Sequence, residues 1–351
     1  MMHWAFMIYV IQGAALFLTN ALFVLAIARS SGLIGKYAIL FAKFITDALS
    51  GLAEVLGGAG RLIIIASGDE TLRCRRFCML MPWNIFFTWT EPMTAIMLLI
   101  VSIDRLFCIA MPIQYYKNGK ELQCLQILIS HMFVSFCILT NWLTTFSDTI
   151  DQFSPLCWTA DSWAPFYEYF SYFLRMGAAI SSVLLYPIVI IAWRHYSRSM
   201  VQRQEACPLN TVNKRSSHKR FALEGDAFLK AYGNRQRQLT ITLGISSIVT
   251  LVLYVIPVSI ESLTKSLQVE HGFGDLTTVY AVVSSNLNPI FNILVIVSRQ
   301  KDIAKAVHNV FADWSCRRNT KVFAARHELA SATRNNTNTT VLKSTPPMKR
   351  F

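Results

Sequence analysis

Long apolar runs, separated by short polar connections, fill most of the chain. Each run is long enough, at about 1.5 Å per helical residue, to cross a hydrocarbon layer about 30 Å thick. Backbone groups cannot stay unpaired in lipid, so the pattern predicts an all-α membrane protein, a bundle of seven transmembrane helices. The seven runs are Trp4–Ala28, Tyr37–Ser67, Phe77–Ile109, Leu122–Phe146, Phe166–Trp193, Gln238–Leu263 and Leu276–Ser298.

The polar segments add an eighth element and a tail. After the seventh run, SRQKDIAKAVHNVFADW brings Ile303, Val307 and Val310 near one side of a helix, which predicts a short amphipathic helix along the membrane face. Residues 1–313 are therefore predicted to form the membrane domain, and residues 314–351 a disordered cytoplasmic tail. The basic segment 194–237 is predicted to be a partly disordered loop.

The placement of basic residues predicts the orientation in the membrane. Only 15% of the residues are charged, against about 25% in a soluble domain. The formal charge of +13 comes from Lys and Arg between the apolar runs, a pattern that argues against nucleic-acid binding. With the N-terminus outside, 26 of the 33 Lys and Arg residues lie on the cytoplasmic side and five outside. This imbalance predicts an outside N-terminus and a cytoplasmic C-terminus, the reverse of insect-odorant-type ion channels.

One polar motif stands where the third run ends. The segment Ser102–Tyr116 reads SIDRLFCIAMPIQYY, so Asp104 and Arg105 lie at the end of a membrane-length helix. Charges there are costly in lipid and are expected to face the bundle interior or a water-filled vestibule. Pro112 follows Arg105 by seven residues and marks a turn into a loop, with Tyr115 three residues later.

A second motif lies inside the seventh run, where Asn288 precedes Pro289 and Asn292 follows. Proline removes a helix hydrogen bond, and the Asn288 amide can replace it. Because the motif is costly within a membrane, it indicates a functional role. Together the two motifs resemble those of rhodopsin-like G-protein-coupled receptors, and the chain resembles nematode serpentine chemoreceptors of the Srsx type over residues 4–313. Leu106 and Asn292 depart from this pattern, because each replaces the family's usual Tyr.

This resemblance implies a chemosensory receptor of the plasma membrane. Such a receptor binds a small-molecule or peptide ligand between the outer helix ends and activates a heterotrimeric G protein from its cytoplasmic side. The basic ends of the 194–237 loop suit a G-protein face or anionic membrane lipid. In the family, a tyrosine at the place of Tyr186 swings toward Arg105 on activation. The residues expected to couple to the G protein are Asp104, Arg105, Pro112, Tyr115, Tyr186, Asn288, Pro289 and Asn292.

Three intramembrane polar residues are expected to form a network. In the resembled family an Asn of helix one bonds an Asp of helix two, and that Asp commonly coordinates a sodium ion that favours the inactive state. Asn20 and Asp47 match these positions, and Lys43 stands four residues before Asp47 on the same helix face. We expect the Lys43 ammonium to take sodium's electrostatic role, with Asn20 and Asn288 completing the hydrogen bonds of the carboxylate. In the alternative, Lys43 extends to the cytoplasmic interface.

The resemblance also guides the ligand-pocket candidates. Amine receptors of the family carry an Asp where Phe87 stands here, and opsins carry the retinal Lys where Val282 stands. These departures disfavour a biogenic-amine receptor and exclude an opsin. Glu91 lies in the outer half of the bundle and is either a counter-ion for a ligand or a structural partner of Arg175. Tyr254 completes the set of candidates.

Three of the eight cysteines, Cys74, Cys78 and Cys157, fall on the outer side and meet an oxidising compartment. The resemblance implies a disulfide between the outer end of helix three and the second outer loop. We expect Cys78 to pair with Cys157, with Cys74 as the competing partner.

Two other function classes were weighed. An intramembrane enzyme needs a nucleophile with its base or a group of metal ligands, and the sequence contains no such pattern, so neither catalysis nor a metal or cofactor is expected. A transporter or ion channel is the stronger alternative. Its ion path would use the charged residues Lys43, Asp47, Glu54, Glu91 and Arg175, but the paired repeats typical of transporters are not apparent.

Overall fold

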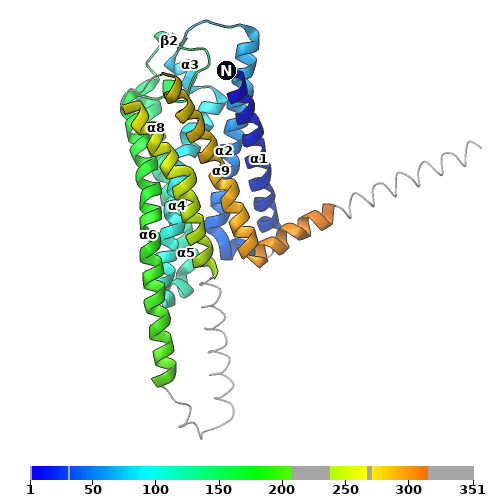
Figure 1. The fold of residues 1–351 in the computed structure, drawn as a ribbon, viewed down its shortest axis with the longest axis vertical. Helices are drawn as coiled ribbons and strands as arrows, with labels where there is room; N and C mark the ends of the chain where they lie inside the picture. The colour runs from blue at the N-terminus through cyan, green and yellow to red at the C-terminus, as the bar shows by residue number, and fades with distance from the viewer. Residues whose placement is uncertain (1, 31, 207–237, 267–270, 315–351) are drawn as a thin grey trace, which may run out of the picture.

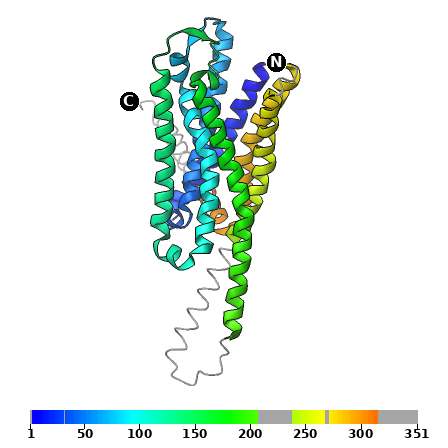
Figure 2. The same cartoon turned by 90° about the vertical axis from the view of Figure 1, so that its left-hand side faces the viewer.

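The computed structural model describes residues 2–30, 32–206, 238–266 and 271–314. Its long helices pack side by side into an elongated bundle (Figures 1 and 2). Seven helices in the described part of the chain are long and apolar enough to cross a membrane, which confirms the predicted fold class. These spans are His3–Arg29, Leu33–Ser67, Pro82–Ala110, Pro112–Thr145, Pro165–Arg194, Gln238–Thr264 and Tyr280–Arg299.

Most spans are single helices, and the sixth is composite. It consists of a helix over residues 238–250, a π-helical turn and then α8. The elements that build the spans are α1 (Met2–Arg29), α2 (Leu33–Ser67), α4 (Pro82–Ala110), α5 (Pro112–Thr145), α6 (Pro165–Ala206), η3 (Leu251–Val255), α8 (Ile256–Ser266) and α9 (His271–Arg299).

Short elements cap one end of the bundle, near the N-terminus in Figure 1. They are β1 (Arg73–Cys74), α3 (Arg75–Met79), β2 (Asp151–Phe153) and η1 (Ala160–Ser162). The two strands pair antiparallel, with Arg73 opposite Phe153 and Cys74 opposite Asp151. We call this end, which contains the Cys78–Cys157 bond, the disulfide end, and the opposite end, where α4 finishes, the Arg105 end.

Two expected loops near the Arg105 end are helical. Pro112 was expected to mark a turn into a loop, but it begins α5 at a position where a missing N–H and a fixed φ suit a first helical residue. The helix continues across a non-helical residue, Asn118. Likewise α6 runs on from Trp193 to Ala206, because no Gly or Pro interrupts residues 194–206. The rest of the expected loop, 207–237, lies outside the described residues.

The third span begins later than the sequence predicted. A separate short helix, α3, contains Phe77, and α4 starts at Pro82, again in the first turn. In the sixth span, Pro257 cannot donate to the carbonyl of Leu253, and the π-helical turn η3 ends just before it. The hydroxyl of Ser284 in α9 donates to that Leu253 carbonyl at 2.8 Å. A neighbouring helix therefore supplies the hydrogen bond that proline removes.

The amphipathic helix after the seventh span is present as residues 301–314, which confirms the prediction. It leaves the base of α9 and runs away from the bundle axis (Figure 1). Its Ile303, Ala306 and Val310 side chains are buried and spaced three or four residues apart, as one apolar helix face requires. The predicted disordered tail, from residue 315 onward, lies outside the described residues.

Candidate functional site

At the Arg105 end, α4 and α5 together hold an ion pair. The guanidinium of Arg105 pairs with the carboxylate of Asp104, and its Nε donates to Asp104 Oδ2 at 3.0 Å. Tyr115 donates its hydroxyl to the other carboxylate oxygen at 2.8 Å. Gln123, about two helical turns further along α5, donates to the Tyr115 oxygen at 2.5 Å. The helical segment after Pro112 thus places Tyr115 against Asp104. The sequence spacing alone did not predict this contact.

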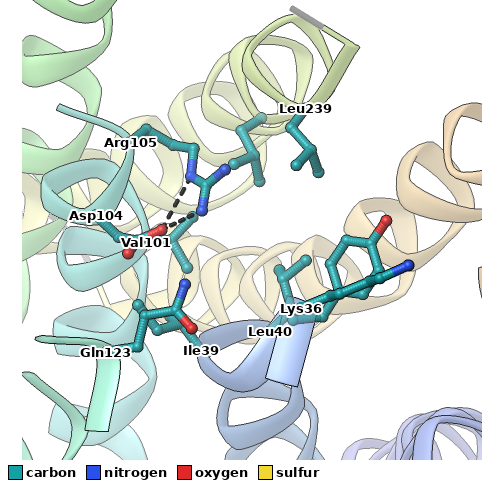
Figure 3. A pocket seen from close by; sticks show the side chains of 10 residues that line it. Lys36, Ile39, Leu40, Val101, Asp104, Arg105, Gln123 and Leu239 are labelled. Atoms are coloured by element: carbon teal, nitrogen blue, oxygen red, sulfur yellow. Dashed lines mark hydrogen bonds and ion pairs between the residues drawn. The ribbon is translucent and has the colours of Figure 1, made fainter. Parts of the chain in front are cut away.

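A small cavity of about 20 Å³ lies beside this ion pair (Figure 3). It has room for about one water molecule. Leu239 and Leu243 from the helix of residues 238–250 close one side of it, and Arg105 is only 9% exposed. The crevice next to the motif is therefore shut in this structure. Its lining comprises Lys36, Tyr37, Ile39, Leu40, Val101, Asp104, Arg105, Gln123, Leu239 and Leu243.

Tyr186 ties two helices together near this cavity. Its buried hydroxyl donates to the backbone carbonyl of Thr240 at 2.6 Å, which joins α6 to the helix of residues 238–250. The ring lies against Gly244, where an added Cβ would be 3.0 Å from the ring carbon Cε1. In this state the Tyr186 hydroxyl is bonded to the sixth span, while Arg105 donates to Asp104 and to Tyr115.

A row of side-chain hydrogen bonds, the polar seam, joins the sixth and seventh spans. Thr250 donates to Asn288 Oδ1 at 3.1 Å, and Ser246 donates to Asn292 Oδ1 at 2.7 Å. Ser246 and Thr250 are one helical turn apart on the sixth span, and Asn288 and Asn292 are one turn apart on α9. The two donors therefore share one helix face. At the base of α9, Gln300 donates to Thr242 at 3.1 Å. The polar seam comprises Thr242, Ser246, Thr250, Asn288, Asn292 and Gln300.

The seam corrects the role expected for the Asn-Pro motif. Its Asn288 accepts hydrogen bonds from Thr250 and from Asn292, rather than completing the hydrogen bonds of Asp47. Sequence reasoning missed the three hydroxyl side chains of the seam, two of which donate and one of which accepts. Their signal was a polar side chain at every fourth position of an otherwise apolar run, Thr242, Ser246 and Thr250.

Of the three residues expected to form an intramembrane network, Lys43 and Asp47 form an ion pair and Asn20 does not join them. Lys43 and Asp47 pair along α2 and are both buried, with Lys43 only 4% exposed, so its ammonium does not extend to the interface. Asn20 instead donates to the Leu16 carbonyl of its own helix at 2.8 Å. Among the described residues, Asp47 Oδ1 has no hydrogen-bond partner. The expected Asn20 contact is absent because a short amide reaches the carbonyl four residues back more easily than a neighbouring helix.

A second cavity of about 20 Å³ adjoins this pair. Lys43 and Asp47 line it from one side, and Ser246 and Asn292 of the polar seam from the other. The rest of its lining is apolar, so these four side chains are its polar members, and it has room for about one water molecule. The ion pair and the seam therefore face each other across one small space.

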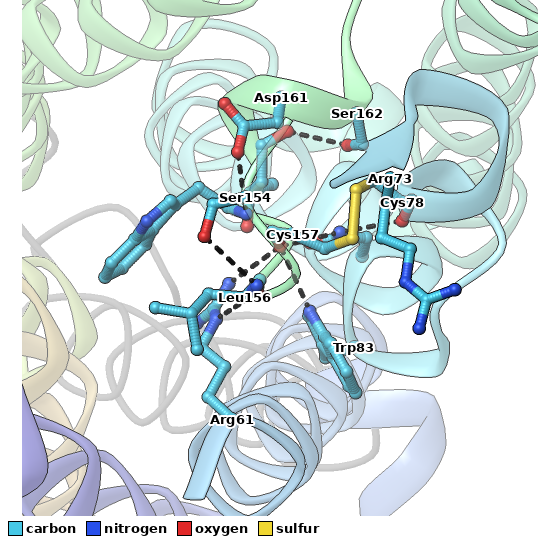
Figure 4. The surroundings of a disulfide bond; sticks show 12 residues. Arg61, Arg73, Cys78, Trp83, Ser154, Leu156, Cys157, Asp161 and Ser162 are labelled. Carbon is cyan, nitrogen blue, oxygen red and sulfur yellow. Dashed lines mark hydrogen bonds between the residues drawn. A yellow bond between two sulfur atoms is a disulfide. The ribbon is translucent and has the colours of Figure 1, made fainter. Parts of the chain in front are cut away.

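At the disulfide end, Cys78 is bonded to Cys157, and Cys74 stays free, which settles the pairing left open by the sequence (Figure 4). Arg61 of α2 donates to the carbonyls of Leu156 and Cys157 at 3.2 and 3.3 Å. Trp83 of α4 also donates to the Cys157 carbonyl, at 3.4 Å. The loop between α5 and α6 is thus fastened to α2 and α4.

Aromatic rings surround the Arg61 guanidinium and complete its environment. The ring centroids of Phe6, Trp83 and Trp158 lie 5.8, 5.9 and 4.8 Å from its central carbon. Rings at such distances attract a cation through their quadrupole. In the same loop, burial raises the pKa of the Asp161 carboxyl above its ordinary value, and the hydrogen bond from the Trp158 backbone opposes that shift.

Glu91 of α4 and Arg175 of α6 form an ion pair in the half of the bundle toward the disulfide end. Of the two roles considered for Glu91, the partner of Arg175 is therefore the one present. Phe87, one turn from Glu91, lies against Gly57 of α2, where an added Cβ would be 3.0 Å from the ring. Tyr254 packs from η3 against a cluster around Met176, and Val282 is half-buried in α9.

Comparison with known families decides the identity of this bundle. The model of serpentine type 7TM GPCR chemoreceptor Srsx matches residues 16–311, most of the chain. The chain belongs to the Srsx family of serpentine chemoreceptors. This match confirms the resemblance inferred from the two motifs and assigns the Srsx chain to a receptor class rather than an enzyme class. A search of curated proteins finds no match to it.

Proposed function

We propose that this Srsx receptor binds an external small-molecule or peptide ligand at the disulfide end and activates a heterotrimeric G protein at the Arg105 end. The observation that carries the proposal is the closed cavity beside Arg105, in a chain of a G-protein-coupled receptor family. A ligand that binds a state with this cavity open more tightly shifts the population toward it. The opened crevice then accepts a segment of the G protein.

Opening requires the helix of residues 238–250 to leave Arg105, because Leu239 and Leu243 close the cavity. That movement breaks the bond from Tyr186 to Thr240 and strains or breaks the polar seam. Each neutral hydrogen bond contributes about 0.5–1.5 kcal/mol net. The sum is a few kcal/mol, the range in which a bound ligand can reverse a two-state equilibrium.

The proposal is tested by a ligand screen in cells that report second messengers. Volatile compounds, water-soluble metabolites and short peptides are applied to cells with and without the receptor. We expect at least one compound to evoke a response only in receptor-bearing cells, and membranes from those cells to exchange guanine nucleotide faster with that compound. A response that occurs without nucleotide exchange supports the transporter or channel alternative instead.

We place the receptor in the plasma membrane with its disulfide end outside. A structural disulfide persists in an oxidising compartment, which supports an outer location for Cys78 and Cys157. The basic residues beyond the described helices, in 207–237 and 315–351, follow the Arg105 end and support its cytoplasmic location. Lipid headgroups on that side suit the amphipathic helix of residues 301–314.

The orientation makes a prediction about glycosylation. Asn335 and Asn338, which lie outside the described residues, each begin an Asn-x-Thr acceptor pattern. A cytoplasmic tail never meets the glycosylating enzyme, so both sites should remain unmodified. Glycosidase treatment should leave the mass of the peptides that contain Asn335 and Asn338 unchanged. A mass shift that disappears in the Asn335→Gln, Asn338→Gln double variant contradicts the orientation.

The polar seam predicts ligand-independent signalling when it is weakened. Removing the donors in Thr250→Val and Ser246→Ala should each raise basal nucleotide exchange about two- to tenfold, because the closed state loses a hydrogen bond of about 0.5–1.5 kcal/mol. Basal second-messenger level, divided by surface expression, is the measurement. Ser259→Ala is the matched control, because that hydroxyl donates only to the Val255 carbonyl of its own span. Unchanged or lower basal signalling in both seam variants contradicts a locking role.

A further inference from the structure

Glu54 of α2 is a buried carboxyl group with one oxygen that has no hydrogen-bond partner in the described part of the chain. Its side chain is only 3% exposed, and its Oε2 has no hydrogen-bond partner among the described residues. No ion pair in that part of the chain includes it. Two basic groups in the same half of the bundle have other partners, since Arg61 donates to loop carbonyls and Arg175 pairs with Glu91.

The position of Glu54 is set by close contact between α1 and α2. An added Cβ on Gly13 of α1 would lie 2.6 Å from the Glu54 Cβ, so the two backbones meet at this level. One turn further along α2, Gly57 lies against Phe87 and Trp83 of α4, at 3.0 and 3.4 Å from an added Cβ. Phe87 and Trp83 therefore meet α2 one turn from Glu54, in the half of the bundle toward the disulfide end.

Other acidic groups add to the negative character of this place. The carboxyl groups of Glu54 and Glu91 interact electrostatically. The Tyr9 phenol of α1 interacts electrostatically with Arg61, and also with Glu54, Glu91 and Glu261 of α8. Acidic side chains of α2, α4 and α8 thus act on one place, while Arg61 and Arg175 are bound to loop carbonyls and to Glu91. An uncompensated carboxylate is costly away from water, so a further positive charge would stabilise this place.

We propose that Glu54 binds the cationic group of the ligand, a protonated primary amine carried on a small aromatic or aliphatic body. The inference rests on the proposed receptor function and names the ligand class. The ammonium donates to the unpartnered Oε2, and the apolar body lies against Phe87 and Trp83. A metal ion does not fit, because the described residues contain no group of three His, Cys, Asp or Glu that could hold one.

This assignment differs from the family's amine receptors. They place the acid on helix three, and the corresponding position here is Phe87. In this chain the acid comes instead from α2, and the helix-three position supplies an aromatic wall. In this proposal an acid on α2 takes the role that the helix-three acid has in those receptors.

The test uses three probes of one shape: 2-phenylethylamine, 2-phenylethanol and 3-phenylpropionate. Thermal unfolding of the purified full-length receptor is measured with each probe at pH 7.4. We expect the amine to raise the unfolding temperature more than the alcohol, and the carboxylate to have no effect. In Glu54→Gln, the amine concentration for half-maximal stabilisation should rise at least about tenfold, because a charge-assisted hydrogen bond is lost. The effect of the alcohol should stay unchanged.

Two further variants complete the design. Glu54→Asp keeps the charge and should keep the preference for the amine, and Glu168→Gln removes an exposed acid at the end of α6 and should behave as wild type. Equal stabilisation by amine and alcohol in the wild type overturns the proposal, as does an amine response that Glu54→Gln leaves intact. Because unfolding is measured without a G protein, an amine that stabilises the receptor without driving nucleotide exchange contradicts only the signalling function.

Discussion

We expect Arg105→Ala to abolish G-protein activation while the receptor still reaches the cell surface. The guanidinium is always charged and offers several donors in a fixed fork, which suits it to leave Asp104 and bind carbonyls of a G-protein segment. Losing two charge-assisted bonds of about 1.5–3 kcal/mol each should reduce ligand-evoked exchange by at least about 100-fold. Nucleotide exchange in membranes, normalised to surface receptor, measures the effect.

Controls separate this role from a structural one. Arg29→Ala removes an exposed arginine at the same end of the bundle and should signal normally. Asp104→Asn should raise basal exchange, because it weakens the ion pair that holds Arg105 in the closed state. Tyr115→Phe should do the same more weakly, since it removes one hydrogen bond to Asp104. Ligand-evoked signalling that persists at the normal level in Arg105→Ala contradicts the mechanism proposed here.

The second large effect is expected in Lys43→Leu, which leaves Asp47 buried without its cation. Removing one partner of a buried pair costs about 3–5 kcal/mol, so the unfolding temperature should fall by several degrees. Sodium should then restore part of this stability, because the freed carboxylate lines a small cavity that Ser246 and Asn292 also line. Thermal unfolding is measured against sodium at constant ionic strength, with N-methylglucamine as the replacement. The wild type should be insensitive.

The double variant Lys43→Leu, Asp47→Asn tests the cause of the loss. It removes both charges, so it should recover stability and lose the sodium response, as is common when both members of a buried pair are replaced. The same titration applies to agonist affinity once an agonist is found. A wild type that responds to sodium, and a Lys43→Leu variant that responds equally, would show that the lysine does not take the place of the ion.

Much of the fold follows from local features of the sequence. The apolar runs are long enough to cross a membrane, and their number predicts the number of spans. The spacing of Ile303, Val307 and Val310 predicts the eighth helix. These features depend on residues close together in the chain, so periodicity and composition are sufficient to predict them. The Asp104–Arg105 and Asn288–Pro289 motifs likewise indicated the family, because charges and prolines are costly within a membrane. The Cys78–Cys157 pairing followed from that family resemblance.

The contacts between helices depend on how each helix is rotated about its axis, which no single segment encodes. Asn288 was expected to reach Asp47, yet α9 turns it toward Thr250 of the sixth span. Tyr115 reaches Asp104 only because α5 begins at Pro112 and carries it back across the end of α4. Glu54 Oε2 has no partner among the described residues, and Arg61 and Arg175 find theirs on other elements. A helix can satisfy its own backbone alone, but its polar side chains take their partners from whichever neighbour the packing brings near.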